Sequence, residues 1–438
     1  MFSNTKNSIN MTHNMSGFGE ERSTMNYTGV IDWLLAYRDP YDIWMSHPSY
    51  VICEFHFLIG AALMIVHALK TGGRWPWLFL SAMTHGFVIE LISYFSPFID
   101  NFWHAQSIIT LFDRRMPLYI TVLYSVFYYH ASWIVSKMQL KSKLVEYMAV
   151  GLMTVLIDMP FDIICVKYVH WIWHDTDPNI YDRHYWVPWN SYYFHLCFST
   201  SFQFWFHSVR SWFETRKNLD KWQSGSMRSE IHALVWSSLL GMPTGCLFFV
   251  LLYHPLHDFY GVSSEAIFVT ILLVFTVIVW RFDRKSGHRF EKPANMNLIS
   301  KLLFGHFLVH YLVFLGTAIF FNPEDAVSVG MHQPIGNCNE TEPVHTFLKA
   351  ILERRKFLCV ENYDEKYYDF KCLQNGRAPS EGSVWYTVCG TQFENRAEYI
   401  TVLSLITFIA YMVFISIHSN CGDKQRQPVE RSERKKLN

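Results

Sequence analysis

The sequence predicts an all-α polytopic membrane protein: a bundle of about nine transmembrane helices with a disulfide-bonded extracytoplasmic loop. Half of the 438 residues are hydrophobic and only 17% are charged, against about 25% in soluble domains. The charged residues gather in short stretches that separate long apolar runs, and one polar segment carries four cysteines. The 37 basic and 37 acidic residues cancel, which gives no bulk attraction to nucleic acid and leaves the lipid bilayer as the expected partner.

A helix needs about 20 mostly apolar residues to cross the hydrocarbon core of a bilayer. The chain offers nine such stretches: Tyr50–Leu69, Trp75–Phe98, Met116–Val135, Leu144–Tyr168, Tyr192–Phe213, Ile231–Tyr253, Glu265–Trp280, Leu302–Phe321 and Tyr399–His418.

Basic residues in the short loops predict the orientation of these spans, because cytoplasmic loops carry an excess of Lys and Arg. The loops on the side of the carboxyl tail hold fifteen Lys and Arg, and those on the opposite side hold three. The sequence therefore predicts an amino terminus outside and a carboxyl terminus in the cytoplasm. The expected membrane is that of the endoplasmic reticulum, the secretory pathway or the cell surface.

The long polar segment between the last two spans points to an oxidising compartment. It carries the sequon Asn339-Glu340-Thr341, which predicts glycosylation of Asn339, and four cysteines: Cys338, Cys359, Cys372 and Cys389. Two disulfides allow three pairings, among which the sequence does not choose. The alternative is four free thiols and an unused sequon. The four cysteines within spans are expected to be small buried apolar residues: Cys53, Cys165, Cys197 and Cys246.

These features divide the chain into five parts. They are an extracytoplasmic amino tail with an interfacial segment (1–49), an eight-span core (50–321), the cysteine-rich loop (322–398), the last transmembrane helix (399–418) and a basic cytoplasmic tail (419–438). Within the loop, we expect a helix only at Val344–Phe357, where Phe347, Leu348, Ile351 and Leu352 recur at helical spacing.

Ionisable residues within the spans are the strongest functional signal, because an acidic side chain at the centre of a bilayer costs about 2.5–3.5 kcal/mol to insert. Four acids fall in the outer halves of their predicted helices: Glu54, Glu90, Asp158 and Asp162. His56 and His195 lie at the same depth, and the outer connections add His104 and His174. This one-sided cluster predicts a functional cavity that faces the outer leaflet. The alternative is that the acids only pair with nearby Arg or Lys.

The spacing between two of these acids makes the prediction more specific. Asp158 and Asp162 are four residues apart and share one helix face, with Pro160 between them. Such a pair suits proton transfer or a divalent metal. His306 and His310 have the same spacing but are expected to make only structural hydrogen bonds.

Several short stretches carry a resemblance to a known family. They are Thr84-His85-Gly86 with Glu90, Trp103-His104-Ala105-Gln106, Arg114-Arg115-Met116-Pro117-Leu118-Tyr119, His174-Asp175-Thr176-Asp177-Pro178 and Val187-Pro188-Trp189. The chain resembles an uncharacterised family of multi-pass membrane proteins from its first to its eighth span, and that resemblance implies no activity. The order of these features is also similar to carotenoid hydratase-type membrane proteins, which have fewer spans and lack the loop. No catalytic residue is carried over from either.

The leading hypothesis is an intramembrane enzyme that modifies a lipid or isoprenoid. Glu90, Asp158 and Asp162 would act as acid/base groups or ligands of a divalent metal, assisted by His104, His174 and His195. A proton- or cation-coupled transporter or channel would use the same acids along a path across the whole membrane. A receptor or scaffold would use the outer loop instead. Whether the protein is an enzyme stays open at this point.

Overall fold

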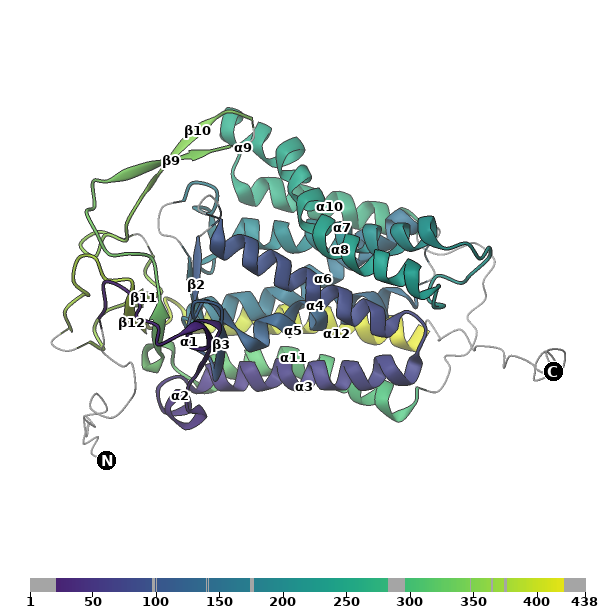
Figure 1. Ribbon diagram of the computed structural model, residues 1–438, viewed down its shortest axis with the longest axis horizontal. Coiled ribbons are helices and arrows are strands. Elements are labelled where there is room, and N and C mark those ends of the chain that lie inside the picture. Colours follow the sequence, from purple (N-terminus) through teal and green to yellow (C-terminus); the bar gives the residue numbers. More distant parts are fainter. Residues whose placement is uncertain are drawn as a thin grey trace.

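The computed structural model describes residues 21–96, 99, 101–138, 140, 142–173, 177–282, 296–346, 348–363, 365–373 and 376–420. The long helices run side by side, and the labelled strands gather at one end of the bundle, which we call the strand end (Figure 1). Helices α1 and α2 also lie at the strand end, whereas α12 ends at the opposite, far end (Figure 1). The helices are α1 (Val30–Leu34), α2 (Pro40–Ser46), α3 (Pro48–Thr71), α4 (Trp75–Phe95), α5 (Leu118–Val135), α6 (Lys143–Lys167), α7 (Trp189–Phe213), α8 (Met227–Phe248), α9 (His254–Tyr260), α10 (Ser264–Arg281), α11 (Leu298–Phe320) and α12 (Arg396–Asn420).

Eight helical segments in this part of the chain are long and apolar enough to cross a membrane. They correspond to eight of the nine predicted spans, which supports a multi-pass membrane protein. The remaining predicted span is α7, a helix of 25 residues that carries many polar side chains. Ser199, Thr200 and Gln203 of α7 are buried against the rest of the protein, so the polarity of this helix faces inward.

Burial distinguishes central helices from peripheral ones. In α5 and α6, 83% of the residues in the most apolar stretch are buried within the protein, whereas in α10 and α12 the share is 28%. The core therefore forms around α5 and α6, and the outlying helices present apolar side chains such as Leu273 and Phe408 outward, as expected for contact with lipid.

The predicted span Ile231–Tyr253 is longer in the structure. Helix α8 begins four residues earlier, where the side chain of Ser226 accepts a hydrogen bond from the backbone N–H of Ser229. After α8 the chain continues through one π-helical turn, Phe249–Tyr253, into α9. Such turns are frequent at functional sites, and Phe249 lines the cavity described below.

In the part of the chain that the structure describes, five small sheets build the strand end. Their pairing orders are β1-β3-β4, β2-β5, β6-β7, β9-β10 and β11-β12-β8, and all pairs are antiparallel. The strands are β1 (Leu35–Tyr37), β2 (Phe102–His104), β3 (Ile109–Leu111), β4 (Met116–Pro117), β5 (Trp171–Trp173), β6 (Arg183–His184), β7 (Val187–Pro188), β8 (Val327–Met331), β9 (Thr341–His345), β10 (Ile351–Arg355), β11 (Tyr368–Asp369) and β12 (Trp385–Gly390).

The cysteine-rich loop differs from prediction in one respect. The helix expected at Val344–Phe357 is wrong, because this stretch forms most of the β9–β10 hairpin. Lys349 closes the hairpin with a φ of 67°, and the backbone N–H of Thr346 bonds the carbonyl of Ala350. Its residues alternate between exposed and partly buried positions, so the period of two prevails over the apparent helical spacing.

The four cysteines of the loop form two disulfides, as predicted, and the structure selects the pairing. Cys338 bonds Cys359, and Cys372 bonds Cys389. We expect non-reducing peptide mapping of the purified protein to recover these two linked pairs, because each bond closes a short loop and so restricts the unfolded chain. Recovery of any other pairing, or of free thiols at these positions, would contradict the fold of the loop.

Candidate functional site

A cavity of about 580 Å³ lies toward the strand end of the bundle. Its walls come from α4, α5, α6, α7 and α8 and from the strands β2 and β5, and Val344–Thr346 at the tip of the hairpin also borders it. Most of the lining is apolar or aromatic and includes Ile89, Leu123, Phe161, Phe194, Phe198 and Trp171. The size is typical of a site for a small molecule, and polar side chains such as Glu90, Asp162 and His195 interrupt the apolar lining and could fix the orientation of a bound molecule.

Two carboxylates and one imidazole meet beside this cavity. Asp158 and Asp162 project from one face of α6, and His195 comes from α7. The Nε2 atom of His195 lies 3.3 Å from Oδ1 of Asp158. One nitrogen or oxygen atom from each of the three side chains lies within 4.8 Å of the other two, a spacing at which they could hold a divalent cation.

A hydroxyl of α7 completes this cluster. Ser191 lies four residues before His195, so both side chains project from the same face of the helix. Its Oγ donates a hydrogen bond of 2.7 Å to Oδ2 of Asp162. Helices α6 and α7 thus each contribute two residues, spaced by one helical turn, to the same group.

A second polar pair faces the cavity from α4. The hydroxyl of Tyr124 donates a hydrogen bond of 2.7 Å to Oε1 of Glu90, whose other oxygen lies 3.9 Å from Nε2 of His104. A glycine makes this arrangement fit, because a Cβ atom at Gly86 would lie only 2.3 Å from the ring of Tyr124. The close approach of α4 and α5 at this point therefore places Tyr124 against Glu90.

The strand pairing positions His104. β2 and β5 pair so that His104 lies opposite Trp171, and both side chains reach the cavity. Burial and, to a smaller degree, the nearby charge of Arg115 lower the pKa of His104 to about 3. His104 is therefore a neutral imidazole at physiological pH and could accept or donate a hydrogen bond to a bound molecule.

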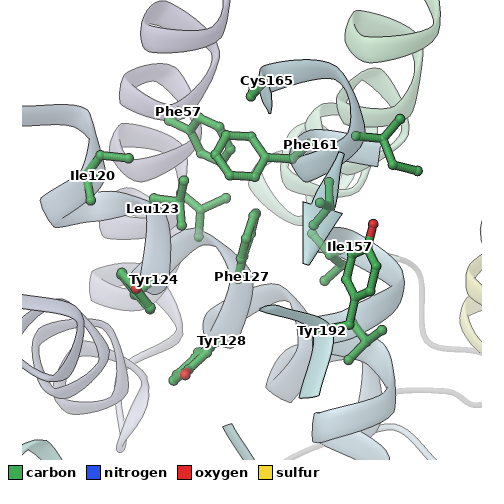
Figure 2. Close-up of a cluster of buried hydrophobic side chains, with 14 of the residues drawn as sticks. Phe57, Ile120, Leu123, Tyr124, Phe127, Tyr128, Ile157, Phe161, Cys165 and Tyr192 are labelled. Atoms are coloured by element: carbon green, nitrogen blue, oxygen red, sulfur yellow. The ribbon is translucent and has the colours of Figure 1, made fainter. Parts of the chain in front are cut away.

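Aromatic side chains close the site on its other side. Phe57, Phe127 and Phe161 come from three helices and pack edge to face, with ring centroids 5.2–5.7 Å apart. Figure 2 shows these rings together, with Tyr124 and Tyr128 on the same helix as Phe127 and with Ile157 and Tyr192 opposite. Phe161 also lines the cavity, so this packed layer supports the apolar wall from behind.

Comparison with known proteins places the chain in a family. The model of a domain of unknown function, DUF7802, matches residues 17–419. The chain belongs to this DUF7802 family. The family resemblance expected from the sequence is thereby supported, whereas no comparison supports the similarity to carotenoid hydratase-type proteins. No curated protein and no solved structure matches this DUF7802 chain.

In this DUF7802 protein, the structure brings five of the six predicted site residues to one region. Glu90, His104, Asp162 and His195 line the cavity, and Asp158 contacts His195. His174 lies outside the described residues. The fourth acid of the sequence prediction, Glu54, lies elsewhere: its carboxylate accepts a hydrogen bond of 3.3 Å from the backbone N–H of Ile108.

The sequence prediction missed a buried imidazole cluster in this DUF7802 chain. It consists of His56 from α3, His130 from α5, and His306 and His310 from α11, all at most 8% exposed. The sequence places His56 at the depth of the outer acids, but in the structure it stacks on His306, with ring centroids 4.4 Å apart. The ring of Phe127 lies 6.0 Å from His195 and 6.1 Å from His310 and therefore separates the two sets. The spacing of His306 and His310 was the only sequence signal for this cluster.

Proposed function

We propose that the protein is a membrane-embedded enzyme that modifies a lipid or an isoprenoid within the cavity. The observation that carries this proposal is the meeting of Asp158, Asp162 and His195 beside a mostly apolar cavity inside a helical bundle. An acyl or isoprenyl chain matches the apolar walls, and the polar cluster provides groups that can take up and return a proton.

The proposed roles follow from the contacts. His195 is assigned the role of the proton-transferring group, and the carboxylate of Asp158, with Oδ1 3.3 Å from Nε2 of His195, would stabilise the charged form of the imidazole. Asp162 and Ser191 form a second hydrogen-bonded pair that can bind a polar headgroup. Glu90, held by Tyr124, and His104 line the same cavity as further acid/base groups, and the ring of Tyr124 lies 6.3 Å from that of His195. A divalent cation among Asp158, Asp162 and His195 would polarise the headgroup in place of proton transfer.

We also propose the nine-span topology with the amino terminus outside and the carboxyl terminus in the cytoplasm, which makes 1–49 and 322–398 extracytoplasmic. The excess of basic residues in the loops on one side supports it. The position of α1 at the strand end and of the end of α12 at the far end is consistent with it (Figure 1). The strand end would then face the lumen or the cell exterior, as its disulfides favour. Asn339 is exposed and would carry a glycan, which Asn339→Gln would remove.

The test compares lipid extracts of cells that lack the protein with cells that express wild type, Asp158→Asn or Glu90→Gln. We expect wild type to change the abundance of one lipid or isoprenoid class. Because an acid/base group contributes about 10²–10⁴-fold to rate, Asp158→Asn should reduce this conversion at least about 100-fold. The matched control is Glu54→Gln, which alters an equally buried acid away from the cavity and should retain the conversion.

The other outcomes contradict the proposal. If Asp158→Asn and Glu90→Gln leave both the lipid profile and the bound metal as in wild type, no enzyme of this kind is present. Ion or solute flux into liposomes that is lost in Asp158→Asn would favour a transporter. A phenotype that depends only on residues of the loop 322–398 would favour a receptor or scaffold.

A further inference from the structure

A second group of metal-binding residue types lies outside the cavity. The thiols of Cys53 on α3 and Cys165 on α6 are 3.8 Å apart, and His170 follows the end of α6. One ligand atom from each of the three residues lies within 4.8 Å of the other two, and all three residues are buried. Figure 2 shows Cys165 on the same helix as Phe161, close to Phe57.

The backbone holds His170 against this helix. Val169 adopts a φ of 51°, which a β-branched residue rarely does, and the chain turns back so that the N–H of His170 bonds the carbonyl of Cys165 at 2.8 Å. The side chain is held as well, because Nε2 of His170 lies 3.3 Å from Oγ of Ser49. Nδ1 of His170 has no hydrogen-bond partner among the residues that the structure describes.

A second imidazole stands beside the first. The ring of His47 lies 4.9 Å from that of His170 and nearly perpendicular to it. His47 bonds the backbone of Tyr168, while its Nε2 is buried and has no partner within the described part of the chain. A ring nitrogen held by a carbonyl leaves the other nitrogen with a lone pair, which is the usual arrangement of an imidazole that binds a metal.

From this geometry we infer that Cys53, Cys165 and His170 form a structural zinc site. His47, whose ring lies 4.9 Å from that of His170 but whose nitrogens lie outside this group, would shift toward the ion as the fourth ligand. Two thiolates at the usual Zn–S distance of about 2.3 Å from a tetrahedral zinc ion are about 3.8 Å apart, as the two sulfurs are here. Zn²⁺, two thiolates and two neutral imidazoles together carry no net charge, so the site tolerates burial at the end of the bundle. Because the cluster is closed off from the cavity, the ion would fasten α3 to the end of α6 rather than act on a substrate.

This inference does not depend on the proposed function. Two other states of the same residues are open. The thiols could make only an S–H···S contact, or they could oxidise to a disulfide, which requires the sulfurs to approach to about 2.05 Å. Each state has a distinct chemical signature, so one set of measurements separates the three.

The experiment uses the full chain purified in lipid nanodiscs. We expect elemental analysis to find one zinc ion per chain that chelators remove slowly. Exchange with Co²⁺ should produce thiolate-to-cobalt absorption in wild type and in Cys197→Ala, which removes a buried free cysteine outside the cluster. Cys53→Ala and Cys165→Ala should lose this absorption. Ser49→Ala should keep the site but weaken zinc binding about tenfold, because it removes only the contact that holds His170.

Asp158→Asn separates this site from the proposed catalytic one, since it should retain the thiolate absorption whatever happens to lipid conversion. If a cysteine variant fails to fold, the zinc content and thiol reactivity of the wild-type protein still test the inference. A metal-free wild type whose two thiols react with an alkylating reagent, with or without added Zn²⁺, would overturn the inference. So would a Cys53–Cys165 disulfide in a non-reducing peptide map.

Discussion

Arg74→Ala is expected to destabilise the protein by about 3–5 kcal/mol, because it would leave a buried carboxylate without its partner. Arg74 is fully buried at the start of α4, and its Nε donates to both oxygens of Glu230, at 3.0 and 2.9 Å. Its other nitrogens donate to Nδ1 of His207 and to the carbonyl of Phe206, each at 2.8 Å. One side chain therefore joins α4, α7 and α8. Thermal unfolding of the variant in nanodiscs measures the loss.

A matched control for Arg74→Ala is Lys356→Ala, which breaks the pair between Lys356 and Glu340. Both side chains of that pair are 45% exposed, so the expected cost is at most about 1 kcal/mol. The double variant Arg74→Met with Glu230→Gln should recover part of the loss, since it removes both buried charges. Equal unfolding temperatures for Arg74→Ala and wild type would show that the buried pair does not hold these helices together.

Acidification below about pH 6.5 is expected to destabilise the strand end. Burial, with a smaller contribution from the charge of Arg115, lowers the pKa of both His104 and His332 to about 3. Both imidazoles are neutral in the folded protein, whereas an unfolded chain takes up protons near pH 6.5. Their contribution to stability is thus complete above pH 6.5 and is lost as the pH falls toward about 3. Each histidine removes about 1.4 kcal/mol per pH unit in this window.

Thermal unfolding at pH 7.5 and at pH 5.5, about one unit below the ordinary histidine pKa, measures this loss. The groups that face the two imidazoles are Arg115 and Tyr94, Glu90 beside His104, and Tyr386 beside His332. His104→Gln with His332→Gln should flatten the pH dependence, while His345→Gln, which alters an exposed imidazole of the same region, should not. An unchanged pH dependence in the double variant would show that these histidines are not its source.

Part of the candidate site could be predicted because its spacing is local. Asp158 and Asp162 lie one turn apart on one predicted helix, so their common face follows from the sequence. The partners could not be predicted in the same way. The sequence names His195 from its depth in the membrane, but its contact with Asp158, like that of Tyr124 with Glu90, depends on how the helices pack. No hydropathy pattern encodes that packing, which depends on details such as the missing side chain at Gly86.

The overall fold, like the site, could be predicted where the sequence signal is local. The length of the apolar stretches predicts the long helices, and the positions of the four cysteines predict the disulfide-bonded loop. The hairpin was mistaken for a helix because Leu348, Ile351 and Leu352 match the helical period over too few residues. The hairpin is defined by its turn, where Lys349 adopts a positive φ. A lysine at this position does not predict such a conformation from the sequence. Helix α7 is predicted correctly as a long helix although its polar residues lower its mean hydropathy. These residues are buried between neighbouring helices.

The hydrogen bonds of the imidazole cluster determine which ring nitrogens carry hydrogen. Nε2 of His310 faces the carbonyl of Ile157 at 2.8 Å, and Nε2 of His306 faces the carbonyl of His56 at 3.0 Å, so both nitrogens carry hydrogen. A neutral His310 then accepts at Nδ1, and the 3.0 Å contact requires Nε2 of His56 to donate. All three rings are fixed as the same tautomer. Among the described residues of this cluster, only His56 and His310 are joined ring to ring by a hydrogen bond, and that bond runs from His56 to His310, whereas His306 and His310 donate to backbone carbonyls, which do not take up a proton. The cluster therefore ties α11 to α3 and α6 and does not form a path for protons.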